Sequence, residues 1–264
     1  MLTGFWLGLL LKMAITATVV VAASMVAERT GPFVAGVLAA TPVSTAPAYA
    51  MLAYAHDSAF IAQSALDSFA GNAAAAVFTV TYVTLAPRLP LAPRLACCAL
   101  AWLAAAAIIH SIAWTVPEAV VLVTVTFAAA IAFMHHVPPG VARARRGRRW
   151  YDLPGRALVV GGVVGTVVSV SRAIGPTATG IATVFPINIS SMAIVIDLRL
   201  GAGMSAATVA SAMRAMTGMT FAYLLLHLIV APLGKWPALL VWLLACITWS
   251  GSLLVWRVLR PAAA

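Results

Sequence analysis

The chain has 264 residues, of which 63% are apolar and only 8% are charged, and its mean hydropathy is +1.04. An average soluble domain has roughly 25% charged residues, so this composition excludes an ordinary soluble protein. The net charge of +10 does not indicate a nucleic-acid partner, because the basic residues lie between apolar runs rather than on one face. The chain is predicted to be an integral membrane protein.

Apolar runs long enough to cross a bilayer follow one another along the whole chain. A transmembrane helix needs about 20 such residues, and long unbroken runs favour helices over barrel strands. The first run lacks a basic segment and a cleavage site, so it is expected to be a retained span rather than a signal peptide. We therefore expect an all-α membrane fold of nine transmembrane helices: 5–27, 33–54, 59–85, 95–113, 117–136, 156–173, 177–197, 204–231 and 236–258.

The arginines between the fifth and sixth predicted spans set the expected orientation. Cytoplasmic loops carry an excess of Lys and Arg, so this loop is predicted to be cytoplasmic, with the N-terminus outside and the C-terminus inside. We expect a multi-pass protein of a bacterial inner membrane, surrounded by lipid. Contact of this loop with anionic lipid or RNA is the alternative to a plain topology determinant. Its arginines are Arg143, Arg145, Arg146, Arg148 and Arg149.

The two halves of the chain repeat one pattern. Residues 1–113 form repeat A, 114–136 a linker span, 137–155 the basic loop and 156–264 repeat B. Five spans precede repeat B, so the two repeats are predicted to have inverted topology, an arrangement that recurs in secondary transporters. At an offset of 144 residues, Gly31, Pro32, Gly36 and Pro42 match Gly175, Pro176, Gly180 and Pro186; after a three-residue slip, Ser64, Asp67 and Gly71 align with Ser211, Arg214 and Gly218.

Each half also resembles a known family. The stretch Arg29-Thr-Gly-Pro-Phe-Val-Ala-Gly-Val-Leu-Ala-Ala-Thr-Pro, a long third span and Arg88-Leu-Pro-Leu-Ala-Pro-Arg94 are similar to the small four-span GlpM-like bacterial membrane proteins. The resemblance implies two such units fused through an additional span. It implies an inner-membrane protein of four-helix modules and says little about a substrate.

Prolines are predicted to interrupt two of the spans. Pro42 and Pro47 lie within 33–54, and Pro186 lies within 177–197. Proline frees a carbonyl in the preceding turn, which must then be satisfied by side chains, water or a ligand. Polar side chains at these interruptions either satisfy local carbonyls or line a substrate site. They are Thr41, Ser44, Thr45, Asn188, Ser190 and Ser191.

Charged residues are expected deep in two spans and at two entrances. Asp67 and Arg214 both reach close to the midplane, and we expect them to pair, either as a structural ion pair or as a site that opens for a charged substrate or proton. Lys12 and its repeat mate Arg156 are expected near opposite surfaces. They either steer anions or anchor to lipid headgroups.

Motifs of enzymes are absent from the sequence, and we expect neither an enzyme nor a cofactor. Cys97-Cys98 and His135-His136 are expected to pack rather than to bind a metal. The expected function is a small secondary transporter or flippase for a polar or anionic metabolite or lipid headgroup, with a homodimer as one expected assembly. The alternative is a non-transporting scaffold or accessory subunit of a membrane complex.

Overall fold

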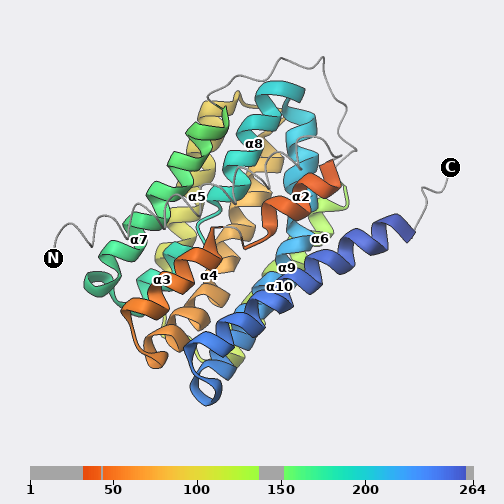
Figure 1. The fold of residues 1–264 in the computed structure, drawn as a ribbon. Coiled ribbons are helices and arrows are strands. Elements are labelled where there is room, and N and C mark those ends of the chain that lie inside the picture. The colour runs from red at the N-terminus through yellow and green to blue at the C-terminus, as the bar shows by residue number, and fades with distance from the viewer. Residues whose placement is uncertain (1–31, 43, 137–151, 260–264) are drawn as a thin grey trace.

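The protein is described here by a computed structural model covering residues 32–42, 44–136 and 152–259. Every regular element in this part of the chain is an α-helix, which confirms the predicted all-α class there (Figure 1). The helices are α2 (Pro32–Ala40), α3 (Thr45–Ala55), α4 (Ser58–Leu85), α5 (Leu91–His110), α6 (Val116–Met134), α7 (Asp152–Thr183), α8 (Ile187–Leu200), α9 (Ala202–Leu233) and α10 (Lys235–Leu259).

Five of these helices are long and apolar enough to cross a membrane, namely α4, α5, α6, α9 and α10. A sixth candidate is the bent pair Ser169–Thr183 and Ile187–Leu200, whose two parts meet at 40°. The chain therefore has the character of a multi-pass membrane protein. The expected span 5–27 and the basic loop lie outside the described residues, so the count of nine spans stays a prediction.

Two spans predicted to be interrupted are each built from two helical pieces. The chain leaves helical geometry between α2 and α3, around Pro42, and between α7 and α8, at Phe185 and Pro186. Pro47, in contrast, does not interrupt a helix, and that expectation is wrong. It is the third residue of α3, where a backbone N–H has no partner within the helix in any case.

A further bend lies inside α7, at Gly175. Its φ of 75° and ψ of 178° are not helical, and Pro176 follows it directly. A positive φ is accessible to glycine without steric penalty, which explains the residue found here. The segment 176–183 between this bend and the break before α8 is called the α7 arm below.

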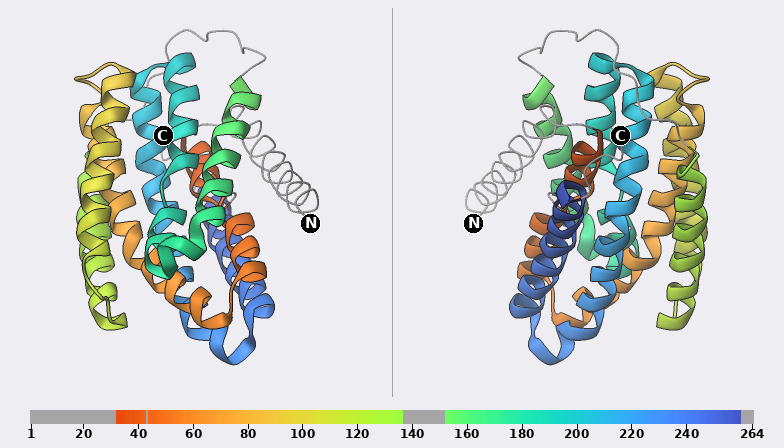
Figure 2. Two further views of the ribbon diagram at one scale, coloured as in Figure 1. Left: turned by 90° about the vertical axis from the view of Figure 1, so that its left-hand side faces the viewer. Right: turned by 90° about the vertical axis from the view of Figure 1, so that its right-hand side faces the viewer.

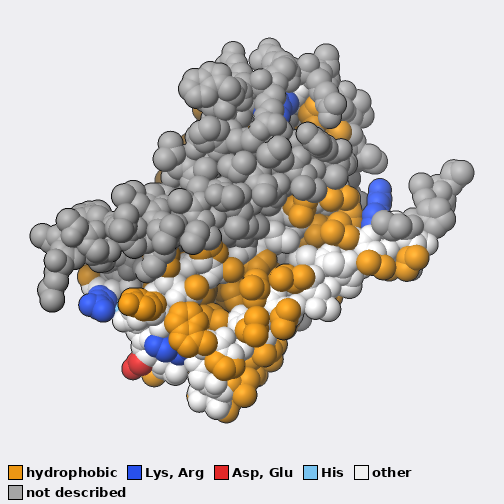
Figure 3. Space-filling view, viewed as in Figure 1, with side chains coloured by type: hydrophobic (Ala, Val, Ile, Leu, Met, Phe, Trp, Pro, Cys, Tyr) orange, Lys and Arg blue, Asp and Glu red, His pale blue; other side chains and the backbone are white. Residues whose placement is uncertain are grey.

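Helix α4 is the central helix of the bundle. Of its most apolar 18-residue window, 72% is buried, against 28% for α5 and 22% for α6, which lie together at one side (Figure 2). Its interior face is rich in small residues, which lets neighbouring backbones approach closely, as is usual between membrane helices. The described part of the surface in Figure 3 is mostly hydrophobic, with charged side chains near its edges.

The two ends of the bundle hold different turns. One end contains the α4–α5 loop and the α8–α9 turn, and the other contains the α3–α4 and α9–α10 turns (Figure 2). Each end therefore combines a turn from the first half of the chain with a turn from the second.

Candidate functional site

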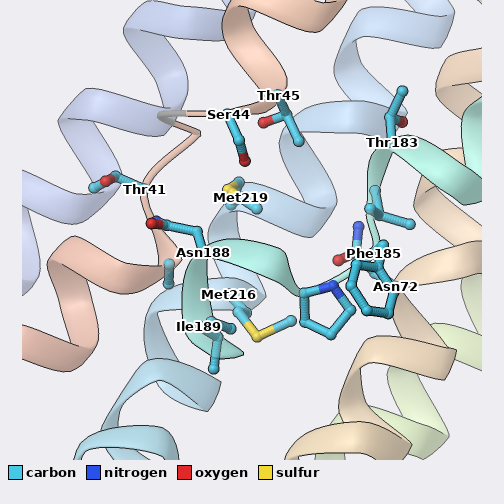
Figure 4. A pocket seen from close by; sticks show the side chains of 13 residues that line it. Thr41, Ser44, Thr45, Asn72, Thr183, Phe185, Asn188, Ile189, Met216 and Met219 are labelled. Carbon is cyan, nitrogen blue, oxygen red and sulfur yellow. The ribbon is translucent and has the colours of Figure 1, made fainter. Parts of the chain in front are cut away.

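A cavity of about 40 Å³ lies between the two helix breaks (Figure 4). This volume holds about two or three water molecules. All four helix ends created by the breaks reach it, because Ala40 ends α2, Thr45 begins α3, Thr183 ends α7 and Asn188 lies in the first turn of α8. The other lining residues are Thr41, Ser44, Asn72, Val184, Phe185, Pro186, Ile189, Met216 and Met219.

Four of the six predicted polar residues come together around this cavity. Thr41, Ser44 and Thr45 reach it from the first break and Asn188 from the second, although even Thr45 and Asn188 are 143 residues apart in the sequence. Ser190 and Ser191 do not line it. The Ser190 hydroxyl donates to the Pro186 carbonyl at 2.7 Å and the Ser191 hydroxyl to the Asn188 carbonyl at 2.9 Å. Both therefore satisfy local carbonyls, the first of the two alternatives given by the sequence.

The polar atoms around the cavity are only partly satisfied. Thr41 Oγ1 donates to the Leu38 carbonyl at 2.6 Å, and Asn72 Nδ2 donates to the Ser68 carbonyl at 2.9 Å. Thr45 Oγ1 is buried and makes no hydrogen bond of good geometry among the described residues, but the buried hydroxyl of Tyr223 is its neighbour. Thr45 and Tyr223 thus form a buried polar pair beside the cavity.

Helix α4 and the α7 arm are joined by a hydrogen-bonded interface beside the cavity. Ser64 Oγ donates to the Pro176 carbonyl at 3.1 Å and Ser68 Oγ to the Gly180 carbonyl at 2.7 Å. Ser68 Oγ also lies 3.0 Å from the Thr183 hydroxyl, which belongs to the cavity wall. The arm is thus held to the central helix up to the cavity itself.

Asp67 lies in this interface and is 1% exposed. Its Oδ2 accepts a hydrogen bond from Gln63 Nε2 at 2.9 Å, one turn earlier on α4. A Cβ atom at Gly180 would lie 3.0 Å from the Asp67 Cβ, so the α7 arm packs directly against Asp67. Asp67 does not line the cavity.

The expected pairing of Asp67 with Arg214 is wrong. Arg214 is exposed on α9, and the two side chains form no ion pair in the described structure. Asp67 packs against the α7 arm, while Ser211, one turn before Arg214, packs against Gly36.

A buried ion pair lies instead at the end of the bundle with the α4–α5 loop. Arg94 is 1% exposed, and its NH2 donates to Asp197 Oδ2 at 2.6 Å. The Arg94 guanidinium also lies 4.7 Å above the ring of Tyr82, whose hydroxyl is 2.8 Å from Ser205 Oγ. We call this contact between the start of α5 and the end of α8 the first latch.

Sequence reasoning missed this pair because charges near span ends are usually solvated. The signal was nevertheless present: the predicted topology puts Arg94 and Asp197 at the same membrane surface. What the sequence lacks is the lateral arrangement that brings the start of α5 against α8.

At the opposite end of the bundle, the start of α10 contacts the turn after α3. Lys235 Nζ, at the start of α10, donates to the His56 carbonyl at 2.7 Å, and His56 Nε2 lies 2.8 Å from Ser171 Oγ. Partial burial lowers the pKa of His56, and the nearby charge of Arg172 lowers it further. We call this contact the second latch.

The two predicted entrance charges cannot be compared with the structure. Lys12 lies outside the described residues, and so does the side chain of Arg156. Within the described residues, no three His, Cys, Asp or Glu side chains gather in a way that suits a metal ion.

Comparison with family profiles, with curated proteins and with solved structures finds no match to this chain.

Proposed function

We propose that this protein is a small secondary transporter or flippase that moves a polar or anionic metabolite or lipid headgroup by alternating access. The observation that carries the proposal is the cavity at the junction of two broken helices, with Thr, Ser and Asn side chains in its wall. Discontinuous helices that meet between repeats supply the substrate sites of many secondary transporters. This architecture is linked to transport by analogy.

Close contacts between the halves support the inverted repeat. A Cβ atom at Gly36 would lie 2.8 Å from the Ser211 Cβ, and Gly180 lies directly against the Ser64 carbonyl. Gly36 matches Gly180 and Ser64 matches Ser211 in the repeat alignment. Each contact is therefore the counterpart of the other, as a two-fold relation between the halves requires.

The two latches support alternating access. The start of α5 contacts the end of α8 at one end, and the start of α10 contacts the turn after α3 at the other. In the predicted repeats these are the same pair of elements, exchanged between the halves. Opening one latch while the other stays closed would expose the cavity to one side of the membrane at a time.

The cavity wall favours recognition through hydroxyl or amide groups. Its polar lining residues are Thr, Ser and Asn, and none of the described lining residues is charged. The volume of about 40 Å³ is too small for a metabolite, so this arrangement corresponds to a closed state that enlarges when a latch opens. The same small volume is the observation that favours the alternative, a non-transporting scaffold.

Uptake by proteoliposomes against a panel of polar and anionic solutes tests the function. We expect Thr45→Val and Asn188→Leu each to lower uptake about fivefold to tenfold, because losing one hydrogen bond to the solute is worth ~1–1.5 kcal/mol. Thr81→Val is the matched control, since the Thr81 hydroxyl bonds the Val77 carbonyl at 2.8 Å and lies away from the cavity. Uptake that is equal in all three variants would place recognition elsewhere, and no uptake of any solute would favour the scaffold.

Cysteine labelling tests the inverted topology. In a background without Cys97, Cys98 and Cys246, single cysteines replace Arg88, in the α4–α5 loop, and Leu233, at the end of α9. These positions occupy equivalent loops of the two repeats. We expect an impermeant thiol reagent to label Arg88→Cys from the cytoplasmic side and Leu233→Cys from the outer side. Labelling of both from one side would mean parallel repeats.

A further inference from the structure

Asp67 differs from the other acidic side chains that the structure describes. Asp57 caps the start of α4, Glu118 lies in the first turn of α6 and Asp197 lies in the last turn of α8. Asp67 is the tenth residue of α4, roughly 14 Å along the helix from its first residue. A buried carboxyl far from a helix end has no ready access to bulk water and is a functional-site candidate by default.

Among the described residues, no Lys or Arg side chain pairs with Asp67. Gln63 and Thr177 are its hydrogen-bonding neighbours, one on α4 and one on the α7 arm. The titratable side chains that influence it are His110 of α5 and His227 of α9, and Tyr49 faces the same region from α3. His227 Nδ1 lies 2.9 Å from the Ala62 carbonyl, so this nitrogen carries the hydrogen of that bond.

An ionised carboxyl at this position would be expensive. A carboxylate buried without a cation is destabilising by several kcal/mol, and buried groups avoid this by taking up a proton. On either side of Asp67, the Pro176 and Gly180 carbonyls point toward α4, where they accept from Ser64 and Ser68. The Gln63 amide and the Thr177 hydroxyl hydrogen-bond to the carboxyl group and offset part of this cost.

We propose that Asp67 is a proton-binding site that couples proton movement to transport, protonated while the α7 arm packs on α4 and deprotonated when the arm moves away. This inference rests on the proposed transport function. Loss of the proton places a negative charge against the arm and weakens its contact with α4. Because Thr183 joins the arm to the cavity wall, movement of the arm changes the cavity.

The described residues show no carboxyl group at the contact that the repeat alignment makes equivalent to this one. The equivalent contact joins α2 to α9 at Gly36, where Thr208 and Ser211 donate to carbonyls of their own helix at 2.9 Å. The residue aligned with Asp67 is the exposed Arg214. The proposed proton site therefore acts on the α7 arm and not on α2, its equivalent in the repeat alignment. Protonation then favours the state in which the α7 arm packs on α4.

Infrared spectroscopy tests the protonation state without any need for transport. The difference between the wild-type protein and Asp67→Asn at pH 7 should contain the carbonyl stretch of a protonated carboxyl. Asp57→Asn, which removes an exposed cap that accepts from Phe60 N at 2.9 Å, is the control and should show a carboxylate difference instead. A carboxylate difference for Asp67 would overturn the proton-binding site.

Proteoliposomes with a pH gradient test the coupling. One pH unit is worth ~1.4 kcal/mol, so at one proton per solute it supports about tenfold accumulation. We expect the wild type to accumulate a solute that it transports, and Asp67→Asn to equilibrate that solute without accumulating it. Accumulation by Asp67→Asn would overturn coupling through Asp67 and leave transport standing. If the wild type moves no solute, the proposed function fails and the coupling with it, while the infrared result still decides the proton site.

Discussion

Replacing Asp197 with asparagine is expected to destabilise the protein by ~3–5 kcal/mol, the usual range for breaking a buried ion pair by removing one partner. The reason is that Arg94 would be left buried without its charged partner. Its side chain is 1% exposed, and its Nε and NH1 already lack hydrogen-bond partners among the described residues. Without Asp197, its NH2 loses the one charged partner that the structure gives it.

The reverse change should be less damaging. Arg94→Met keeps an unbranched side chain over the ring of Tyr82, and the abandoned Asp197 side chain is 13% exposed, so water can reach it. The double variant with Arg94→Met and Asp197→Asn should recover much of the stability lost in Asp197→Asn, because it leaves no buried charge. Arg214→Met, at an exposed arginine on α9, is the control and should have a small effect.

Unfolding of the purified protein in detergent, followed by circular dichroism against denaturant, measures these differences. If Asp197→Asn unfolds at the same denaturant concentration as the parent, the first latch contributes nothing to the stability of the folded protein. If Arg214→Met is instead the strongly destabilised variant, the charge pairing expected from the sequence alone would have to be reconsidered.

The elements of the fold were largely predictable because membrane helices carry their signal in local composition. The apolar runs expected at 59–85, 117–136 and 204–231 correspond closely to α4, α6 and α9. The break at Pro42 was predictable because proline lacks an N–H. The position of Pro47 was misjudged because the effect of a proline depends on where the helix begins, and its true start at Thr45 is a property of the folded chain.

The candidate site was predictable only in part, for a different reason. Thr41, Ser44, Thr45 and Asn188 are polar residues beside prolines, a local pattern visible in the sequence. Asn72, Met216 and Met219 complete the same cavity from α4 and α9. These two helices have apolar residues on all sides, so the hydrophobic periodicity of the sequence does not show which face is turned inward. The ion pair of Arg94 with Asp197 depends on lateral helix packing, which composition does not encode.

Close packing of the halves leads to the second large effect. Gly180→Ala is expected to destabilise the protein by ~1–3 kcal/mol or more, the range for overpacking a filled interior. A Cβ atom there would overlap the Ser64 carbonyl oxygen, which belongs to the backbone of α4 and cannot turn aside as a side chain would. The α7 arm would have to move away, which would stretch the bond from Ser68 Oγ to the Gly180 carbonyl, 2.7 Å long.

Gly36→Ala should have a similar effect at the equivalent contact, because its Cβ would lie 2.6 Å from the Thr208 carbonyl oxygen and 2.7 Å from the Ala212 nitrogen. Gly251→Ala is the matched control: it lies inside α10 with open space around the new Cβ, and alanine there should be stabilising by ~0.5–1 kcal/mol. The same unfolding measurement applies. Equal stability of the three alanine variants would mean that α4 and α9 do not approach the opposite half as closely as described. A loss confined to one of Gly36 and Gly180 would count against the two-fold relation between the repeats, since that relation requires both contacts to respond alike.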